Sequence, residues 1–152
     1  MGDKAEEGLK QALEKAIPFS LDDIIRARRD EMALRMSTAE ELAELPSMVS
    51  MFDNQKQVKA TINEWRIVCL DRNVDGKNYM LTGIDARTGN VWATSIIKSV
   101  DIESHFVLTR NSLYRLGTMG EGEPTFHTIL HLCHILHKWG LGARFGVPYI
   151  FY

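Results

Sequence analysis

Residues 61–76 read Thr61-Ile-Asn-Glu-Trp-Arg-Ile-Val-Cys-Leu-Asp-Arg-Asn-Val-Asp-Gly76. The first part of this stretch is rich in β-branched, aromatic and other apolar side chains, which predicts a strand over 62–71. The Asp75-Gly76 pair that follows favours the positive φ angles of a tight turn. The stretch therefore predicts the first strand of a hairpin together with its turn.

The same rhythm continues downstream, where turn residues recur about every ten positions. Apolar segments between these turns predict further strands over 78–86, 91–98, 104–109 and 112–117. Five consecutive short strands predict an antiparallel β-meander that curls into a half-open barrel, because an open sheet of this size leaves unpaired edges. We expect Trp65 and Trp92 to lie in its core.

The flanking segments have helical spacing instead. Apolar residues recur at helical intervals over 3–16 and 21–35, and Ser37 with Glu40 forms a capping-box pattern for a third, short helix that Pro46 ends. A link over 47–60 leads to the meander. Residues 125–139 predict a C-terminal helix, and the apolar tail 147–152 is expected to dock on the core. The predicted fold class is α+β, with N-terminal helices, a five-stranded antiparallel meander and the C-terminal helix packed on the sheet.

The composition predicts one globular domain, since 45% of the 152 residues are hydrophobic and 25% are charged. The charge is uneven: residues 1–53 hold seven Lys/Arg and twelve Asp/Glu, whereas residues 54–152 hold eleven and eight. No apolar run approaches the roughly 18 residues of a membrane span and the N-terminus is charged, so we expect a cytoplasmic protein with no membrane partner. Cys69 and Cys133 lie in apolar segments, which indicates buried, reduced thiols.

Four histidines lie in the predicted C-terminal helix. At about 100° per residue His127, His131 and His134 share one stripe, opposite an apolar face. The stripe has three interpretations: a solvent-facing surface, a protein interface, or a metal site to which Glu121 or Glu123 adds a ligand. We predict no bound metal and no cofactor, because solvation alone explains the stripe.

The basic residues of the meander form a second candidate surface. They are interleaved with aromatic residues, and small barrels bind nucleic acids through that combination. No ribonucleoprotein-type motif accompanies them. The nucleic-acid candidates are Arg66, Arg72, Lys77, Arg87, Lys98, Arg110 and Arg115.

The sequence contains no familiar catalytic or nucleotide-binding motif, so we expect a protein that is not an enzyme. The favoured function is a small intracellular module that binds another protein and occupies its surface, as an inhibitor, immunity factor or adaptor. The hypothesis extends to a second copy of the chain, as a homodimer. Methionines, histidines and aromatic residues supply adaptable contacts, and the interface candidates are Met32, Met36, His127, His131, His134, Tyr149, Phe151 and Tyr152. The alternatives are nucleic-acid binding and a metal-dependent hydrolase that uses the histidine helix.

Overall fold

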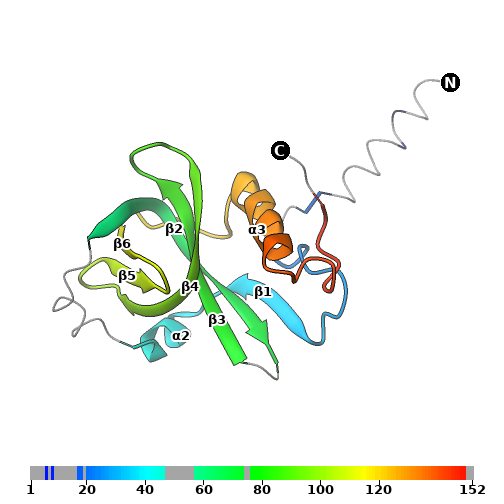
Figure 1. Cartoon of the computed structure of the whole chain (residues 1–152), viewed down its shortest axis with the longest axis horizontal. Helices are drawn as coiled ribbons and strands as arrows, with labels where there is room; N and C mark the ends of the chain where they lie inside the picture. The colour runs from blue at the N-terminus through cyan, green and yellow to red at the C-terminus, as the bar shows by residue number, and fades with distance from the viewer. Residues whose placement is uncertain are drawn as a thin grey trace.

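The computed structural model describes Glu6, Gly8 and residues 17–18, 20–46, 57–73 and 76–149. Figure 1 shows α3 on one side of the molecule and β5 and β6 on the other. The α+β class, the antiparallel meander and the C-terminal helix are confirmed. The elements in chain order are β1 (Met32–Met36), α2 (Ala39–Glu44), β2 (Val58–Arg72), β3 (Gly76–Asp85), β4 (Val91–Asp101), β5 (Phe106–Thr109), β6 (Leu113–Leu116) and α3 (Phe126–Lys138).

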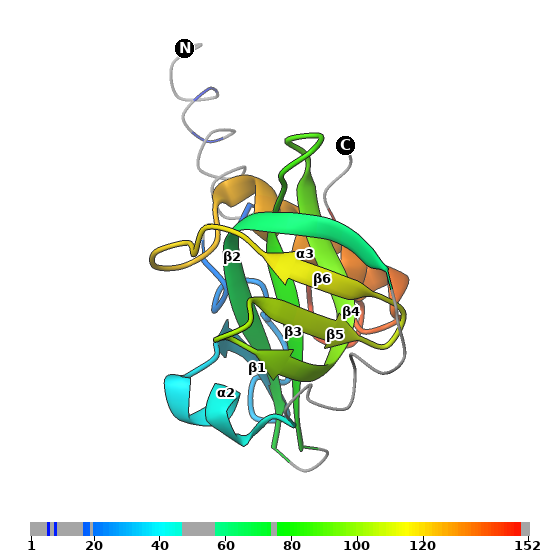
Figure 2. The ribbon, with the colours of Figure 1, turned by 90° about the vertical axis from the view of Figure 1, so that its left-hand side faces the viewer.

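Strands β2 to β6 close into a barrel, where the sequence predicted a half-open one. Consecutive strands pair antiparallel, and β6 then pairs with β2 in parallel, from Val58↔Leu113 to Ile62↔Leu116. Strand direction alternates along a meander, so the first and fifth strands run the same way and can close only as a parallel pair. Figure 2 looks onto β5 and β6, with α3 on the far side of the barrel.

Strand β2 serves both the barrel and the sheet beneath α3. Its N-terminal part pairs with β6, and its C-terminal part pairs with β1, from Met32↔Arg72 to Met36↔Val68. The register with β3 shifts between Asn63 and Arg66, and Glu64 takes a φ of 49° at this irregularity. Opposite the bend, a Cβ on Gly83 would lie 2.6 Å from the carbonyl oxygen of Asn63, so the close approach of the two strands requires glycine.

The helix predicted over 21–35 is wrong, and so is the strand count. Residues 20–31 form turns and bends, and Met32–Met36 form a sixth strand, β1. Consecutive turns, and not a helix, bury the three apolar residues whose spacing resembled that of a helix: Leu21, Ile24 and Ile25. The chain cannot continue as a helix beyond them, because Arg28 has a φ of 53° and the carbonyl of Phe145 accepts hydrogen bonds from the backbone of residues 26 and 27.

The third predicted helix exists, with its cap one residue later than expected. Thr38 is the N-cap of α2, and Glu41 rather than Glu40 completes the capping box. The first predicted helix lies outside the described residues apart from Glu6 and Gly8. Most of the predicted link, residues 47–56, also lies outside them.

The molecule has two hydrophobic cores, and they lie on opposite faces of the same strands. Alternate residues of β2 enter different cores: Ile67 and Cys69 face the barrel interior, whereas Val68 and Leu70 face α3. Trp65 lies inside the barrel with 6% of its surface exposed, as expected. Trp92 is half-buried and packs against the same barrel core. The core under α3 contains Leu132 and Leu136 of that helix, together with Phe145 and Val147, which follow it. Helix α3 is therefore held against the outside of the barrel sheet.

Candidate interaction site along the C-terminal helix

Helix α3 has one buried face and one accessible face. Thr128, Ile129, Leu132, Cys133, Ile135 and Leu136 are buried, which confirms the predicted apolar face. His127 and His134 are exposed, and His131 is half-buried with its ring stacked on that of His134 at 6.5 Å between centroids. The histidine stripe thus follows the accessible side of the helix and dips toward the sheet at its centre.

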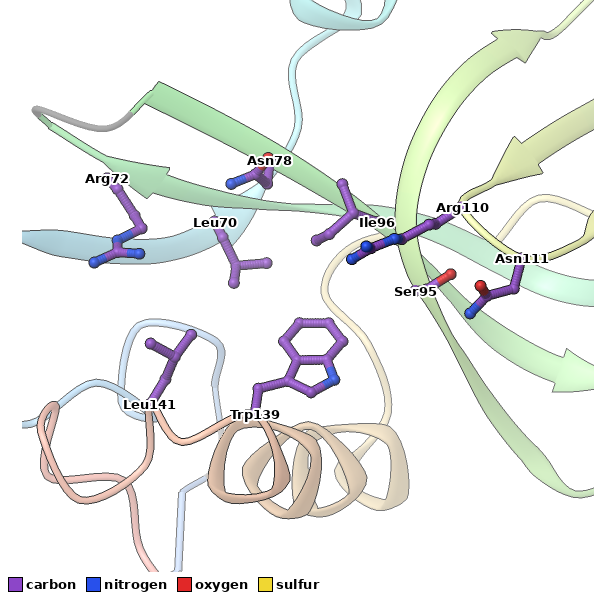
Figure 3. Close-up of a pocket in the computed structure, with 9 residues that line it drawn as sticks. All are labelled: Leu70, Arg72, Asn78, Ser95, Ile96, Arg110, Asn111, Trp139 and Leu141. Atoms are coloured by element: carbon purple, nitrogen blue, oxygen red, sulfur yellow. The ribbon is translucent and has the colours of Figure 1, made fainter.

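A groove lies between the C-terminal end of α3 and the sheet. Its main hollow has a volume of about 630 Å³. The apolar lining consists of Leu70, Ile96, Trp139 and Leu141, and the polar lining of Arg72, Asn78, Ser95, Arg110 and Asn111. Figure 3 shows the Trp139 ring and the Leu70 and Ile96 side chains pointing into the same space, with Arg72 on one side and Arg110 on the other.

A second hollow of about 280 Å³ continues the groove between α3 and β4. It shares Ser95 and Trp139 with the first hollow and adds His131, His134 and Lys138. We call the two hollows together the α3 groove. Neither contains an aspartate or glutamate among its lining residues in the described part of the chain. The groove is therefore cationic, in a chain whose formal net charge is −2.

Burial lowers the pKa of His131, and the neighbouring His134 and Lys138 lower it further. The neutral imidazole is favoured in this position, so the permanent charges of the groove are those of Arg72, Arg110 and Lys138. The hydroxyl oxygen of Ser95 is buried and has no hydrogen-bond partner among the described residues. An unpaired hydroxyl of this kind costs stability unless a ligand or water satisfies it.

The segment after α3 folds back on the helix, as predicted for the start of the tail. The ring of His137 lies against Tyr149 at 3.7 Å between centroids, and its Nε2 is 2.8 Å from the carbonyl oxygen of Val147. Gly142 makes room for this ring, because a Cβ there would lie 2.0 Å from His137 Nδ1. Val147 is buried, whereas Tyr149 is 69% exposed. Phe151 and Tyr152 lie outside the described residues.

The two methionine candidates differ in their accessibility to a partner. Met32 is 1% exposed in β1, and Met36 is half-buried against the core under α3. The predicted helix over 21–35 included Met32, but both methionines lie in β1. The other interface candidates within the described residues belong to α3 or to the segment that follows it: His127, His131, His134 and Tyr149.

The nucleic-acid candidates are dispersed. Arg66 donates to the backbone carbonyls of Glu121 and Gly122, and Lys77 pairs with Glu41 at 3.3 Å. Arg115 lies over the Phe106 ring. Arg87 and Lys98 are exposed at other places on the barrel. Only Arg72 and Arg110 converge, and they do so in the α3 groove.

A buried carboxylate that the sequence analysis did not single out anchors α2 to the sheet. Glu41 accepts hydrogen bonds from Arg35 at 2.8 and 2.9 Å, from the Thr38 backbone at 2.9 Å and from the Tyr79 hydroxyl at 3.1 Å. The Arg35 guanidinium holds the pKa of this carboxyl well below its usual range, with help from Thr38, Tyr79 and Lys77. Every lone pair of the carboxylate is engaged, so the cluster is structural. The displaced capping box was its only local sequence signal.

The thiols and histidines do not assemble into a reactive centre in the described part of the chain. Burial raises the pKa of Cys69 and of Cys133 to about 11, so both thiols are protonated at neutral pH. His137 lies one helical turn after Cys133, and its Nε2 contacts the backbone carbonyl of Val147 in the tail. No three His, Cys, Asp or Glu side chains of the described residues come together as metal ligands do.

Within the same residues, no helix is long and apolar enough to cross a bilayer. No family model matches the chain, and comparison with curated proteins and with solved structures finds no similar protein.

Proposed function

We propose that this chain is a small, non-enzymatic module that binds another protein along α3 and acts by occupying that partner's surface. The observation that carries the proposal is the position of the exposed aromatic side chains. Among the described residues, the large aromatic residues with exposed rings are Phe126, Trp139 and Tyr149, at 39%, 38% and 69%. All three lie on α3, at its C-cap or in the segment that folds back on it. Aromatic anchors of this kind are enriched in protein interfaces.

The barrel favours a protein partner over a nucleic acid. Of its aromatic residues, Trp65, Tyr79 and Tyr114 are at most 8% exposed. Trp92 and Phe106 are half-buried, and Lys59 and Arg115 of the chain itself lie over their rings. None of these five rings is therefore a fully exposed platform on which bases could stack. Among its basic candidates, Arg66 binds backbone carbonyls, Lys77 binds a carboxylate and Arg115 lies over an aromatic ring of the chain itself. We place the protein in the cytoplasm, which the two buried, unbridged thiols favour.

The test is affinity capture from the native cell, with nuclease treatment, using the full chain and two double variants. Phe126→Ala with Tyr149→Ala removes two anchors of the α3 surface. Ile102→Ala with Met119→Ala is the matched control, because these side chains are 40% and 70% exposed and lie on the barrel side. We expect a stoichiometric protein partner that survives nuclease and is lost only with the first variant. Loss of all partners on nuclease treatment, or loss with the control alone, would refute the proposal.

A further inference from the structure

We infer that the α3 groove receives an acidic segment of a protein partner in which one apolar side chain is flanked by carboxylates. This inference rests on the proposed function and assigns the chemistry of the partner. Its first support is charge: the groove carries Arg72, Arg110 and Lys138 with no acidic lining residue in the described part of the chain. Such a surface is complementary to an anion and steers it during association.

The arrangement of apolar and cationic groups specifies the anion further. Leu70 and Ile96 on the sheet face the Trp139 ring at the end of α3 across an apolar hollow, with the Arg72 guanidinium on one side and the Arg110 guanidinium on the other (Figure 3). A planar guanidinium binds a carboxylate through two parallel hydrogen bonds. An apolar side chain inserted between the sheet and the Trp139 ring would therefore place a carboxylate before it and one after it on the sides where the two arginines lie.

The remaining polar groups suit a peptide backbone. The side-chain amides of Asn78 and Asn111 can each donate and accept, as an extended peptide with its alternating N–H and C=O groups requires. A volume of about 630 Å³ holds a few side chains and not a folded domain. The expected occupant is a short linear segment.

A single-stranded nucleic acid fits this groove less well. Successive bases need successive aromatic faces, and Trp139 is the one aromatic ring among the residues that line the groove in the described part of the chain. One ring with two flanking guanidinium groups matches one apolar anchor between two charges. A nucleic acid is accordingly an outcome of the test that contradicts the inference.

The test is a titration of the full chain, followed by ¹H–¹⁵N NMR, with the peptide acetyl-Glu-Glu-Leu-Glu-Glu-amide. We expect shifts at the Trp139 indole and at the Asn78 and Asn111 side-chain amides, with binding that weakens as salt rises. The analogue with four glutamines, and the analogue with serine in place of leucine, should each bind about tenfold more weakly or worse, since one lost charge-assisted contact or apolar anchor is worth about 1.4 kcal/mol or more. Arg72→Gln with Arg110→Gln should give the same loss.

Variants are compared only after their spectra show the dispersion of the folded chain, and Trp139→Ala serves as a second variant because its ring is 38% exposed. Equal binding of the glutamine analogue, shifts confined to other surfaces, or tighter binding of a five-nucleotide thymidylate at the same resonances would each overturn the inference. Failure here is distinguishable from failure of the proposed function. A nuclease-resistant partner that is lost with Phe126→Ala and Tyr149→Ala, but kept with Arg72→Gln and Arg110→Gln, leaves the proposed function standing and refutes the acidic segment.

Discussion

Replacing Glu41 by glutamine should lower the free energy of unfolding by about 2 to 3 kcal/mol at pH 7. Removing one partner of a fully buried ion pair costs about 3 to 5 kcal/mol. The cost is smaller here because the side chains of Arg35 and Lys77 are 35% and 47% exposed, so water partly solvates the cations that the carboxylate leaves behind. Glutamine retains one acceptor for the Thr38 backbone but presents an amide to the remaining donors.

Urea denaturation measures this effect, and the midpoint of thermal unfolding should fall by about 4 to 12 °C. Glu44→Gln is the control, since Glu44 is exposed on the same helix. The pKa of Glu41 is lowered in the folded state, so its contribution is fully present above the unfolded pKa of about 4.3 and is lost as the pH falls through the folded value. The difference between wild type and variant should therefore shrink below about pH 4. A difference under about 0.5 kcal/mol at pH 7, or one undiminished at pH 3, would refute the reasoning.

Three further predictions follow from packing. Gly142→Ala should cost about 1 to 3 kcal/mol in urea denaturation, because its Cβ would meet His137, and adding His137→Ala should recover part of that loss; additive effects would contradict the contact. Trp65→Ala should cost about 3 to 5 kcal/mol, and Trp139→Ala less than half as much, since the rings are 6% and 38% exposed; equal costs would place Trp139 in the core. Cys69 and Cys133 should react with a thiol reagent at pH 8 only after unfolding, because burial raises both pKa values to about 11; rapid labelling of the native chain would show that a thiol is accessible.

The meander could be predicted from sequence because its determinants are local. Turn residues such as Gly76 and Gly89, which take positive φ, bound each strand, and the apolar residues between them set its length. Closure of the barrel was not predictable in the same way. It depends on the pairing of Ile62 with Leu116 across more than fifty residues, and no local pattern specifies such a contact.

The wrong prediction of a helix over residues 21–35 has a different physical origin. Leu21, Ile24 and Ile25 have the spacing of a buried helical face, but a series of turns buries the same set. The backbone of this segment is fixed by Phe145, which lies more than a hundred residues away and is itself fully buried. Tertiary contacts therefore override the local helical pattern.

Only the part of the candidate site that lies on a single element, helix α3, could be predicted from the sequence. The histidine stripe could be found because α3 alone positions it. The groove beside it combines Leu70 of β2, Ser95 of β4, Arg110 of the β5–β6 turn and Trp139 of the helix end. Trp139 is the C-cap residue of α3, and its ring lines the groove at the point where the helix ends.

The most direct measurement of the central claim is photo-crosslinking in the native cell with a benzophenone side chain at a single position. At position 134 the probe replaces an exposed histidine that lines the α3 groove. At position 115 it replaces an exposed arginine on β6, across the barrel from α3 (Figure 2). We predict that position 134 crosslinks to one protein partner, and that position 115 does not. Crosslinking of that partner only from position 115, or of nucleic acid from position 134, would contradict the account.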